Sequence, residues 1–234
     1  MLLCKPPAAF LPTGRSLLAS MLALGLSACV QTTETAPPAR PTVDPAVQAM
    51  YGPVTDGEEK VPPVDTSKMD PKNVRQIVNY RTPYPPGTIV VDPHARFLYL
   101  VMENNKAMRY GVGVAKAGLA FEGEAVIERK GRWPGWVPTP DMIRREPARY
   151  GPLAKGMPGG INNPLGARAL YLYKNGEDTL YRIHGTNEAW SIGKSVSSGC
   201  IRLLNQDIID LHSRVPEGSK VVVLGPEQSG KGEF

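Results

Sequence analysis

Two residues in the C-terminal part of the chain could form a nucleophilic pair, Cys200 and His184. A cysteine attacks a carbonyl as its thiolate, and a neighbouring histidine can take up the thiol proton. Cys200 follows a Ser-Ser-Gly turn signal in SVSSGCIRLLN (195–205), where a tight turn can bring backbone N–H groups together around an oxyanion. His184 lies in TLYRIHG (179–185), which alternates like a β-strand. The intervening residues suffice for a loop that returns Cys200 to this strand end.

The cysteine inventory sharpens the case for Cys200. Residues 1–29 read as an export signal, with an apolar run at 16–26 that is too short to span a membrane. The segment ends in Leu-Ser-Ala-Cys, which resembles a bacterial lipobox and would make Cys29 a lipid anchor; the alternative is ordinary cleavage that leaves a soluble protein. Cys4 would leave with the signal. Cys200 then remains without a disulfide partner in an oxidising compartment, as either an inert buried thiol or a reactive one.

The elements that must position this pair are mainly strands. Residues 30–86 are predicted to form a Pro-rich tether and an arm packed on the main domain, with a short helix or turn at Pro71 capped by Asp70. Residues 87–225 form the expected catalytic domain, and 226–234 a C-terminal tail. Strands are predicted at 88–92, 97–101, 107–114, 124–130, 169–174, 179–185 and 220–224. One clear helix is predicted at 205–215, with Asn205 as its cap.

The resulting fold class is mostly β, largely antiparallel, with one or two helices. Residues 131–168 form a long Gly/Pro-rich insertion, and such segments usually serve as lids or groove walls. Two tryptophans in this insertion, Trp133 and Trp136, could be a sugar platform or could pack in the loop, and packing is favoured.

Several other functions are disfavoured by composition and motif. The chain has 234 residues, 41% of them apolar, which suits one domain, and a net charge of +5 without the Lys/Arg run typical of nucleic-acid binding. GVGVAKAG (111–118) lacks the glycine spacing of a dinucleotide loop. Three scattered histidines do not form a zinc motif, so no metal or cofactor is expected. His94 is interpreted as a surface turn residue and His212 as a helix packing residue.

The segment HGTNEAWSIGKSVSSGCIRL (184–203) closely resembles the signature of the L,D-transpeptidases, the YkuD-type catalytic domain. The resemblance extends over about residues 87–224 and includes PPGTIVVD, WPGW (133–136) and NPLGARALYL (163–172). Two positions vary: Ser198 stands where many members have His or Arg, and Arg202 where others have Asn. The resemblance implies an L,D-transpeptidase-like β-sandwich or barrel.

The resemblance also implies roles for individual residues. Cys200, paired with His184, would attack the carbonyl of the third stem-peptide residue of peptidoglycan and release the terminal D-Ala. Backbone N–H groups around Gly199 and Cys200 would form the oxyanion hole, and the Gly185 carbonyl would orient the imidazole. The substrate-binding candidates are Ser197, Ser198 and Arg202. Arg202 could alternatively be a structural ion-pair partner.

The function expected from these residues is a periplasmic, lipid-anchored L,D-transpeptidase that binds stem peptides and contacts the membrane through Cys29, without nucleic acid. The acceptor amine stays open between a second stem peptide, a free D-amino acid and an envelope protein. An L,D-carboxypeptidase or other hydrolase using the same thioester is one alternative. The other is a non-catalytic cell-wall binding lipoprotein.

Overall fold

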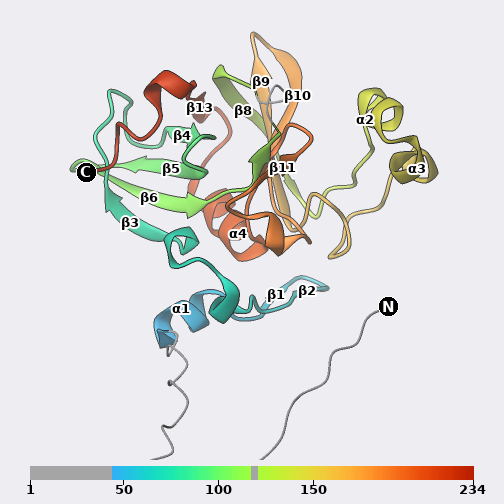
Figure 1. Ribbon diagram of the computed structural model, residues 1–234, viewed down its shortest axis with the longest axis horizontal. Coiled ribbons are helices and arrows are strands. Elements are labelled where there is room, and N and C mark those ends of the chain that lie inside the picture. Colours follow the sequence, from blue (N-terminus) through green and yellow to red (C-terminus); the bar gives the residue numbers. More distant parts are fainter. Residues whose placement is uncertain (1–43, 117–120) are drawn as a thin grey trace, which may run out of the picture. The chain divides into compact units, whose positions relative to one another are not determined.

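The computed structural model describes residues 44–116 and 121–234 (Figure 1). The expected signal segment, Cys4, Cys29 and the first part of the expected tether lie outside the described residues. Within the described residues, no helix is long and apolar enough to cross a membrane.

A nine-stranded sheet dominates the described residues, as the mostly-β prediction required. Six of its eight pairings are antiparallel; β10 with β12 and β4 with β13 are parallel. In spatial order the strands are β12 (Ile201–Arg202), β10 (Glu177–His184), β9 (Arg168–Lys174), β8 (Gly123–Arg132), β13 (Lys220–Val223), β4 (Ile89–Asp92), β5 (Phe97–Met102), β6 (Lys106–Gly111) and β3 (Gln76–Asn79).

The sheet is apolar on both faces where its central strands run. Alternate residues such as Ile89 and Val91 of β4 enter one core, which also holds Leu170 of β9 and Ile208 of helix α4 (Asn205–Arg214). Val90, between the first two, enters a second core on the opposite face. Strands β4, β5 and β6 and strands β8, β9 and β10 all contribute side chains to the first core. α4 packs into the same core (Figure 1).

The predicted strand at 107–114 is interrupted, and this prediction needs correction. β6 ends at Gly111, and Val114–Ala115 form a separate strand, β7, that pairs in parallel with β11 (Ser195–Ser197). Glycines are needed at this break, because neighbouring atoms leave no room for a side chain. A Cβ on Gly111 would lie 2.7 Å from the side chain of Asn73. A Cβ on Gly113 would lie 2.7 Å from the Ser191 carbonyl oxygen. The backbone bends here and bonds to the loop that precedes Cys200.

The predicted helix at 205–215 is present as α4, but the predicted cap is wrong. The N-cap residue is Leu204, without a side-chain cap, and Asn205 is the first helical residue. The Asn205 side chain instead accepts a hydrogen bond from the Ala167 N–H and donates one to the Thr186 carbonyl.

The insertion at 131–168 contains two short helices, so it is less irregular than predicted. They are α2 (Pro140–Arg145) and α3 (Pro147–Tyr150), and they stand to one side of the sheet (Figure 1). Thr139 caps α2 by accepting a hydrogen bond from the Met142 N–H at 3.2 Å.

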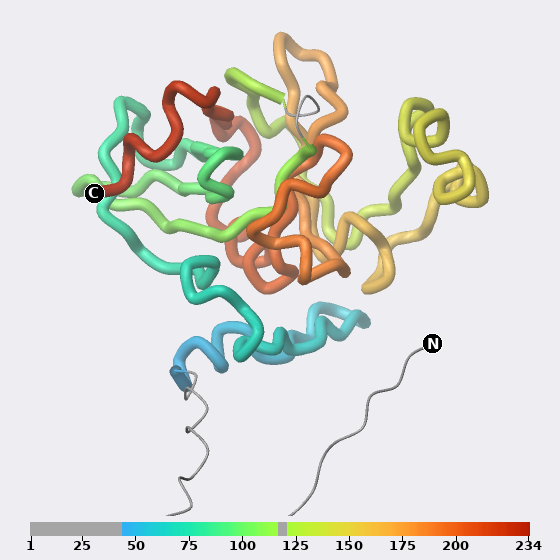
Figure 2. Tube along the Cα trace, in the orientation of Figure 1, coloured from blue at the N-terminus to red at the C-terminus, as the bar shows by residue number. Residues whose placement is uncertain are grey.

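The arm contains the short turn expected at Pro71, and it also supplies an edge strand of the sheet. Asp70 accepts a hydrogen bond from the Lys72 N–H at 3.0 Å and caps the 3₁₀ turn Pro71–Asn73. The arm also holds helix α1 (Pro45–Met50), a hairpin of β1 (Val54–Asp56) with β2 (Glu59–Val61), and β3. Figure 2 shows this blue-to-teal part of the chain running beneath α4 before it joins the sheet.

Two polar clusters hold the arm on the domain. Asp56 forms ion pairs with Arg168 and Arg132, and accepts a hydrogen bond from the Trp133 indole at 2.8 Å. Hydrogen bonds from Arg168 are the main reason that the pKa of Asp56 falls to about 2. This contact packs Trp133 against the arm, in line with the favoured interpretation of this residue. The C-terminal tail also docks: the Tyr99 hydroxyl donates to Glu233 at 3.0 Å.

The second arm cluster contains a buried carboxyl, Asp207 of α4. The Tyr51 hydroxyl donates to Asp207 at 3.2 Å, and the Arg75 guanidinium lies 3.5 Å from it and 3.3 Å from Asp210. Burial raises the pKa of Asp207 to about 7, and the nearby Arg75 offsets this only in part. Burial prevails because Asp207 is fully buried and its Oδ1 has no hydrogen bond.

This raised pKa predicts a pH-dependent stability difference between wild type and the Asp207→Asn variant. The unfolded carboxyl ionises above about pH 3.8 and the folded one only above about 7, so wild-type folding takes up a proton between these values. Wild-type stability from this group therefore falls as the pH rises from 4 to 7. Urea unfolding at several pH values should show the variant gaining relative to wild type over that window, and a constant difference above it.

Asp210 is the matched control, because it shares Arg75 but its pKa is lowered, with hydrogen bonds from Arg214 and Tyr110 outweighing burial. Its contribution to stability is present above the unfolded pKa and is lost as the pH falls. Asp210→Asn should therefore show its relative gain only at acidic pH. A difference for Asp207→Asn that does not change between pH 4 and 7 would contradict the assigned ionisation.

Candidate active site

His184 ends β10 and is buried, with 4% of its surface exposed. Its Nδ1 lies 2.5 Å from the Gly185 carbonyl oxygen, which can only accept a hydrogen bond. The proton is therefore assigned to Nδ1, and Nε2 carries the basic lone pair. Burial, assisted by the positive charge of Arg202, lowers the pKa of His184 to about 3. The imidazole is neutral at neutral pH and available as a base.

Cys200 joins this histidine through a parallel strand pair. Ile183 of β10 pairs with Ile201 of β12, and His184 pairs with Arg202. Ile183 and Ile201 point into the core, so the residues that alternate with them project from the opposite face. Cys200 immediately precedes β12, and the alternation places its side chain on the same face as His184.

The Cys200 thiol is half-buried and not predisposed to ionise. Burial raises its pKa, while a backbone hydrogen bond from Arg182 and the positive charges of Arg182 and Arg202 offset part of the effect. The directions of the two shifts favour a neutral thiol and a neutral imidazole in the resting site.

The turn before Cys200 is organised by Ser197. Its hydroxyl donates to the Cys200 carbonyl oxygen at 2.6 Å and accepts from the Gly199 N–H at 3.3 Å. Gly199 has φ +150°, a conformation that L side chains rarely adopt. Since the Gly199 N–H already has a long hydrogen bond, it would have to share or exchange that partner to serve an oxyanion. Ser197 is buried and supports the turn from beneath, whereas Ser198 is half-buried.

A cavity of about 580 Å³ opens over these residues. The insertion supplies one wall, as expected for residues 131–168, and β10 with the loop of Cys200 supplies the other. Its lining includes His184, Ser197, Ser198, Gly199, Cys200, Arg202, Glu188, Asn187, Leu180, Tyr181, Trp136, Asp141, Met142, Arg145, Arg149, Tyr150 and Leu165. Trp136 thus reaches the cavity and tilts against Tyr150, with ring centroids 6.0 Å apart. The volume suits a peptide segment of a few residues.

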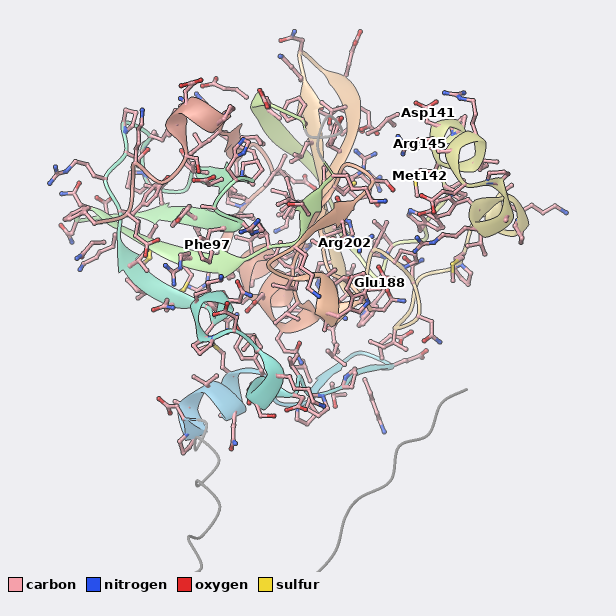
Figure 3. The ribbon with its side chains drawn as sticks, in the orientation of Figure 1. Phe97, Asp141, Met142, Arg145, Glu188 and Arg202 are labelled. Atoms are coloured by element: carbon pink, nitrogen blue, oxygen red, sulfur yellow. The ribbon has the colours of Figure 1, made fainter. Side chains whose placement is uncertain are left out.

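Glu188 is a cavity residue that the sequence analysis did not identify. Its carboxylate lies 2.7 Å from Arg202 and 3.7 Å from Arg149 of α3, so it links the Cys200 segment to the insertion. In Figure 3, Glu188 and Arg202 lie near the centre, while Asp141, Met142 and Arg145 of α2 lie across from them. Nothing in the sequence around Glu188 distinguishes it from a solvated loop carboxylate.

The ion pair between Arg202 and Glu188 allows a test of the two interpretations of Arg202, as a substrate-binding residue or as a structural ion-pair partner. We expect a double-mutant cycle of Arg202→Ala and Glu188→Ala to give a coupling of about 1 kcal/mol in the free energy of unfolding, since both side chains are partly buried. Urea unfolding of wild type, both single variants and the double variant measures it. A coupling near zero would leave Arg202 free for the substrate.

The remaining histidines lie away from the cavity. His94 is exposed in the turn after β4, and His212 is half-buried on α4, as interpreted from the sequence. Burial lowers the pKa of His212 to about 4. Among the described residues, no group of three or more His, Cys, Asp or Glu side chains could hold a metal ion.

The family model and the curated relatives that match this chain indicate the same family. The model of the YkuD family, the L,D-transpeptidase catalytic domain, matches residues 86–223. Probable L,D-transpeptidase ErfK/SrfK from Escherichia coli K12 is 38% identical over 140 residues, covering 59% of this chain and 44% of that protein. Probable L,D-transpeptidase YbiS from the same strain is 35% identical over 137 residues, covering 58% and 43%. The chain thus spans less than half the length of these relatives.

Solved structures are similar over a comparable part of the chain. A crystal structure from Brucella melitensis, described as a probable carnitine operon oxidoreductase, is 52% identical, with a TM-score of 0.46 over 68% of this chain and 99% of that one. L,D-transpeptidase 3 from Mycobacterium tuberculosis is 13% identical, with a TM-score of 0.42 over 59% of this chain and 60% of that one. The family match covers more than half of the sequence and includes both His184 and Cys200. The chain belongs to the L,D-transpeptidase family of YkuD-type catalytic domains.

Proposed function

We propose that this protein is a peptidoglycan L,D-transpeptidase in which Cys200 is the nucleophile and His184 the base. The observation that supports it most is the pairing of β10 with β12, which projects both side chains from one sheet face at the cavity. The third residue of a stem tetrapeptide would place its carbonyl carbon at the Cys200 sulfur. The insertion would form the opposite wall for the rest of the donor peptide.

The reaction balances without a cofactor. As the Cys200 sulfur bonds to the carbonyl carbon, the thiol proton passes to Nε2 of His184, and the oxyanion is held by N–H groups of the 199–200 turn. The bond to D-Ala then breaks, and the imidazolium returns the proton to the departing amine. A thioester remains. An acceptor amine attacks it, His184 takes the amine proton, and the proton returns to the sulfur as the new amide forms.

Hydrolysis is the second candidate, because water can attack the same thioester. An L,D-carboxypeptidase would release D-Ala and a tripeptide, whereas a transpeptidase would join the acyl group to the amine. Incubation with a soluble tetrapeptide muropeptide, with and without a D-amino acid or a second stem peptide, separates them by mass spectrometry. We expect the amine adduct to exceed the tripeptide when the acceptor is present. A protein that forms no acyl-enzyme would favour the non-catalytic wall-binding reading.

The lipobox-like end at Cys29 supports a further part of the proposal, that the chain is an envelope lipoprotein at the periplasmic face of a membrane. The Pro/Thr/Ala-rich sequence that follows Cys29 is predicted to be a tether. Such a spacer would confine the catalytic domain near one membrane face and raise its effective concentration at the wall.

Anchoring and chemistry should then be separable. Cys29→Ser is expected to move the protein from the membrane fraction to the soluble fraction while its turnover of soluble muropeptides stays at the wild-type level. Cys200→Ala should stay in the membrane fraction and be inactive. Cell fractionation followed by an in vitro assay of both variants checks this, and wild-type protein that is soluble with an unmodified N-terminus would remove the anchor.

A further inference from the structure

Backbone hydrogen bonds hold the chain immediately after His184. The His184 carbonyl accepts from the Leu203 N–H at 2.8 Å, and the Gly185 N–H donates to the Arg168 carbonyl at 3.0 Å. The Gly185 carbonyl is the group that meets the imidazole Nδ1. Whether it keeps this direction depends on the peptide unit that it forms with Thr186, and therefore on what holds Thr186.

The side chain of Asn205 holds Thr186. Asn205 is buried at 6% exposure; its Nδ2 donates to the Thr186 carbonyl at 3.1 Å, and its Oδ1 accepts from the Ala167 N–H at 2.9 Å. Both hydrogen-bonding groups of the amide are thus used, and they join two backbone segments that meet beside His184. An unpaired amide in this place would be costly, which indicates a specific arrangement.

The same amide fills the space beside two glycines. A Cβ on Gly185 would lie 2.4 Å from Asn205 Oδ1, and one on Gly166 would lie 2.3 Å from it. The Gly185 Cα is therefore pressed against Asn205. Without this side chain, Thr186 would lose the hydrogen bond to its carbonyl, and Gly185 would lose the side chain packed against it.

We propose that Asn205 is a positioning residue for His184: it holds Thr186 through the carbonyl of the following peptide and packs against Gly185, so that the Gly185 carbonyl keeps the imidazole proton on Nδ1 and leaves Nε2 free for the thiol. The proposal rests on His184 acting as the base of Cys200. It also explains why Asn205 does not cap α4. The residue lies in the first turn of the helix, 21 positions from His184 in sequence, and acts on the imidazole only through backbone.

The test uses Asn205→Ala and the isosteric Asn205→Asp, which can still accept from the Ala167 N–H but, when ionised, cannot donate to Thr186. Long-range ¹H–¹⁵N NMR of histidine-labelled protein reports the His184 tautomer without any substrate. We expect Nδ1–H in wild type and a partial or full change to Nε2–H in both variants. Acylation by a tetrapeptide muropeptide should slow about 10- to 100-fold in the rate constant, less than removal of the base itself.

Asn163 is a matched control, since it is also buried and its amide also bonds backbone on both sides, donating to Pro158 at 2.8 Å and accepting from Leu165 at 2.8 Å. Asn163→Ala should lower the free energy of unfolding by an amount similar to Asn205→Ala but leave the His184 tautomer unchanged. The proposal is overturned if either folded Asn205 variant keeps the wild-type tautomer and acylation rate. A wild-type protein without turnover would instead refute the proposed function, and the tautomer measurement would still stand.

Discussion

Cys200→Ala is expected to abolish acyl-enzyme formation and D-Ala release completely, because no other described side chain at the cavity is a thiol. The substitution removes one sulfur atom from a half-buried position, so the free energy of unfolding should change by about 1 kcal/mol at most. Intact-protein mass spectrometry after incubation with a tetrapeptide muropeptide measures the adduct. Circular dichroism and urea unfolding establish that the fold is retained.

The matched comparison is Ser197→Ala, which keeps the nucleophile but removes the hydroxyl that links Gly199 N–H to the Cys200 carbonyl. That variant should still acylate, more slowly, since only the geometry of the turn is loosened. Adduct formation that survives in Cys200→Ala, or that maps to another residue, would refute the nucleophile assignment.

The part of the site that sequence could predict is the part made of local segments. Cys200, its Ser-Ser-Gly turn and the strand that ends at His184 all lie within one stretch of chain, so their spacing carries the information. The alternation of apolar residues likewise predicted β4, β5 and β9 to within a residue or two. Alternate residues of β4 and β5 enter the two cores, and β9 places Leu170 and Leu172 in the first core.

The rest of the site depends on contacts between distant residues. Asn205 has the right type and place for a helix cap, and only the proximity of Ala167 and Thr186 shows why its amide is used otherwise. Tyr51 and Asp207 meet across 156 positions, and no periodicity links them. Glu188 is a single carboxylate in a loop until Arg202 and Arg149 are placed beside it.

The environment of the pair distinguishes between two ways of activating a cysteine. In one, a thiolate–imidazolium pair exists before substrate binds, which requires a lowered thiol pKa and a raised histidine pKa. The opposite holds here: burial raises the pKa of Cys200, and burial with the charge of Arg202 lowers that of His184 to about 3. Under the proposed mechanism the proton would therefore move during the attack, with His184 as a general base. Since His184 is already neutral above about pH 4, wild-type acylation should show no rate change near pH 6.5 from histidine ionisation.

His184→Ala should consequently slow acylation by about 10²- to 10⁴-fold, the range for loss of a positioned base. Alkylation of Cys200 by iodoacetamide should behave differently, because it depends on thiolate that is already ionised: its rate in wild type should rise continuously through pH 9, and His184→Ala should leave that profile nearly unchanged. His94→Ala and His212→Ala, whose side chains lie outside the cavity lining, should match wild type in both assays. Stopped-flow acylation and alkylation rates between pH 5 and 10 measure these effects. An alkylation rate that is constant from pH 5 to 8 in wild type and collapses in His184→Ala would show a preformed ion pair, and the general-base step would then be wrong.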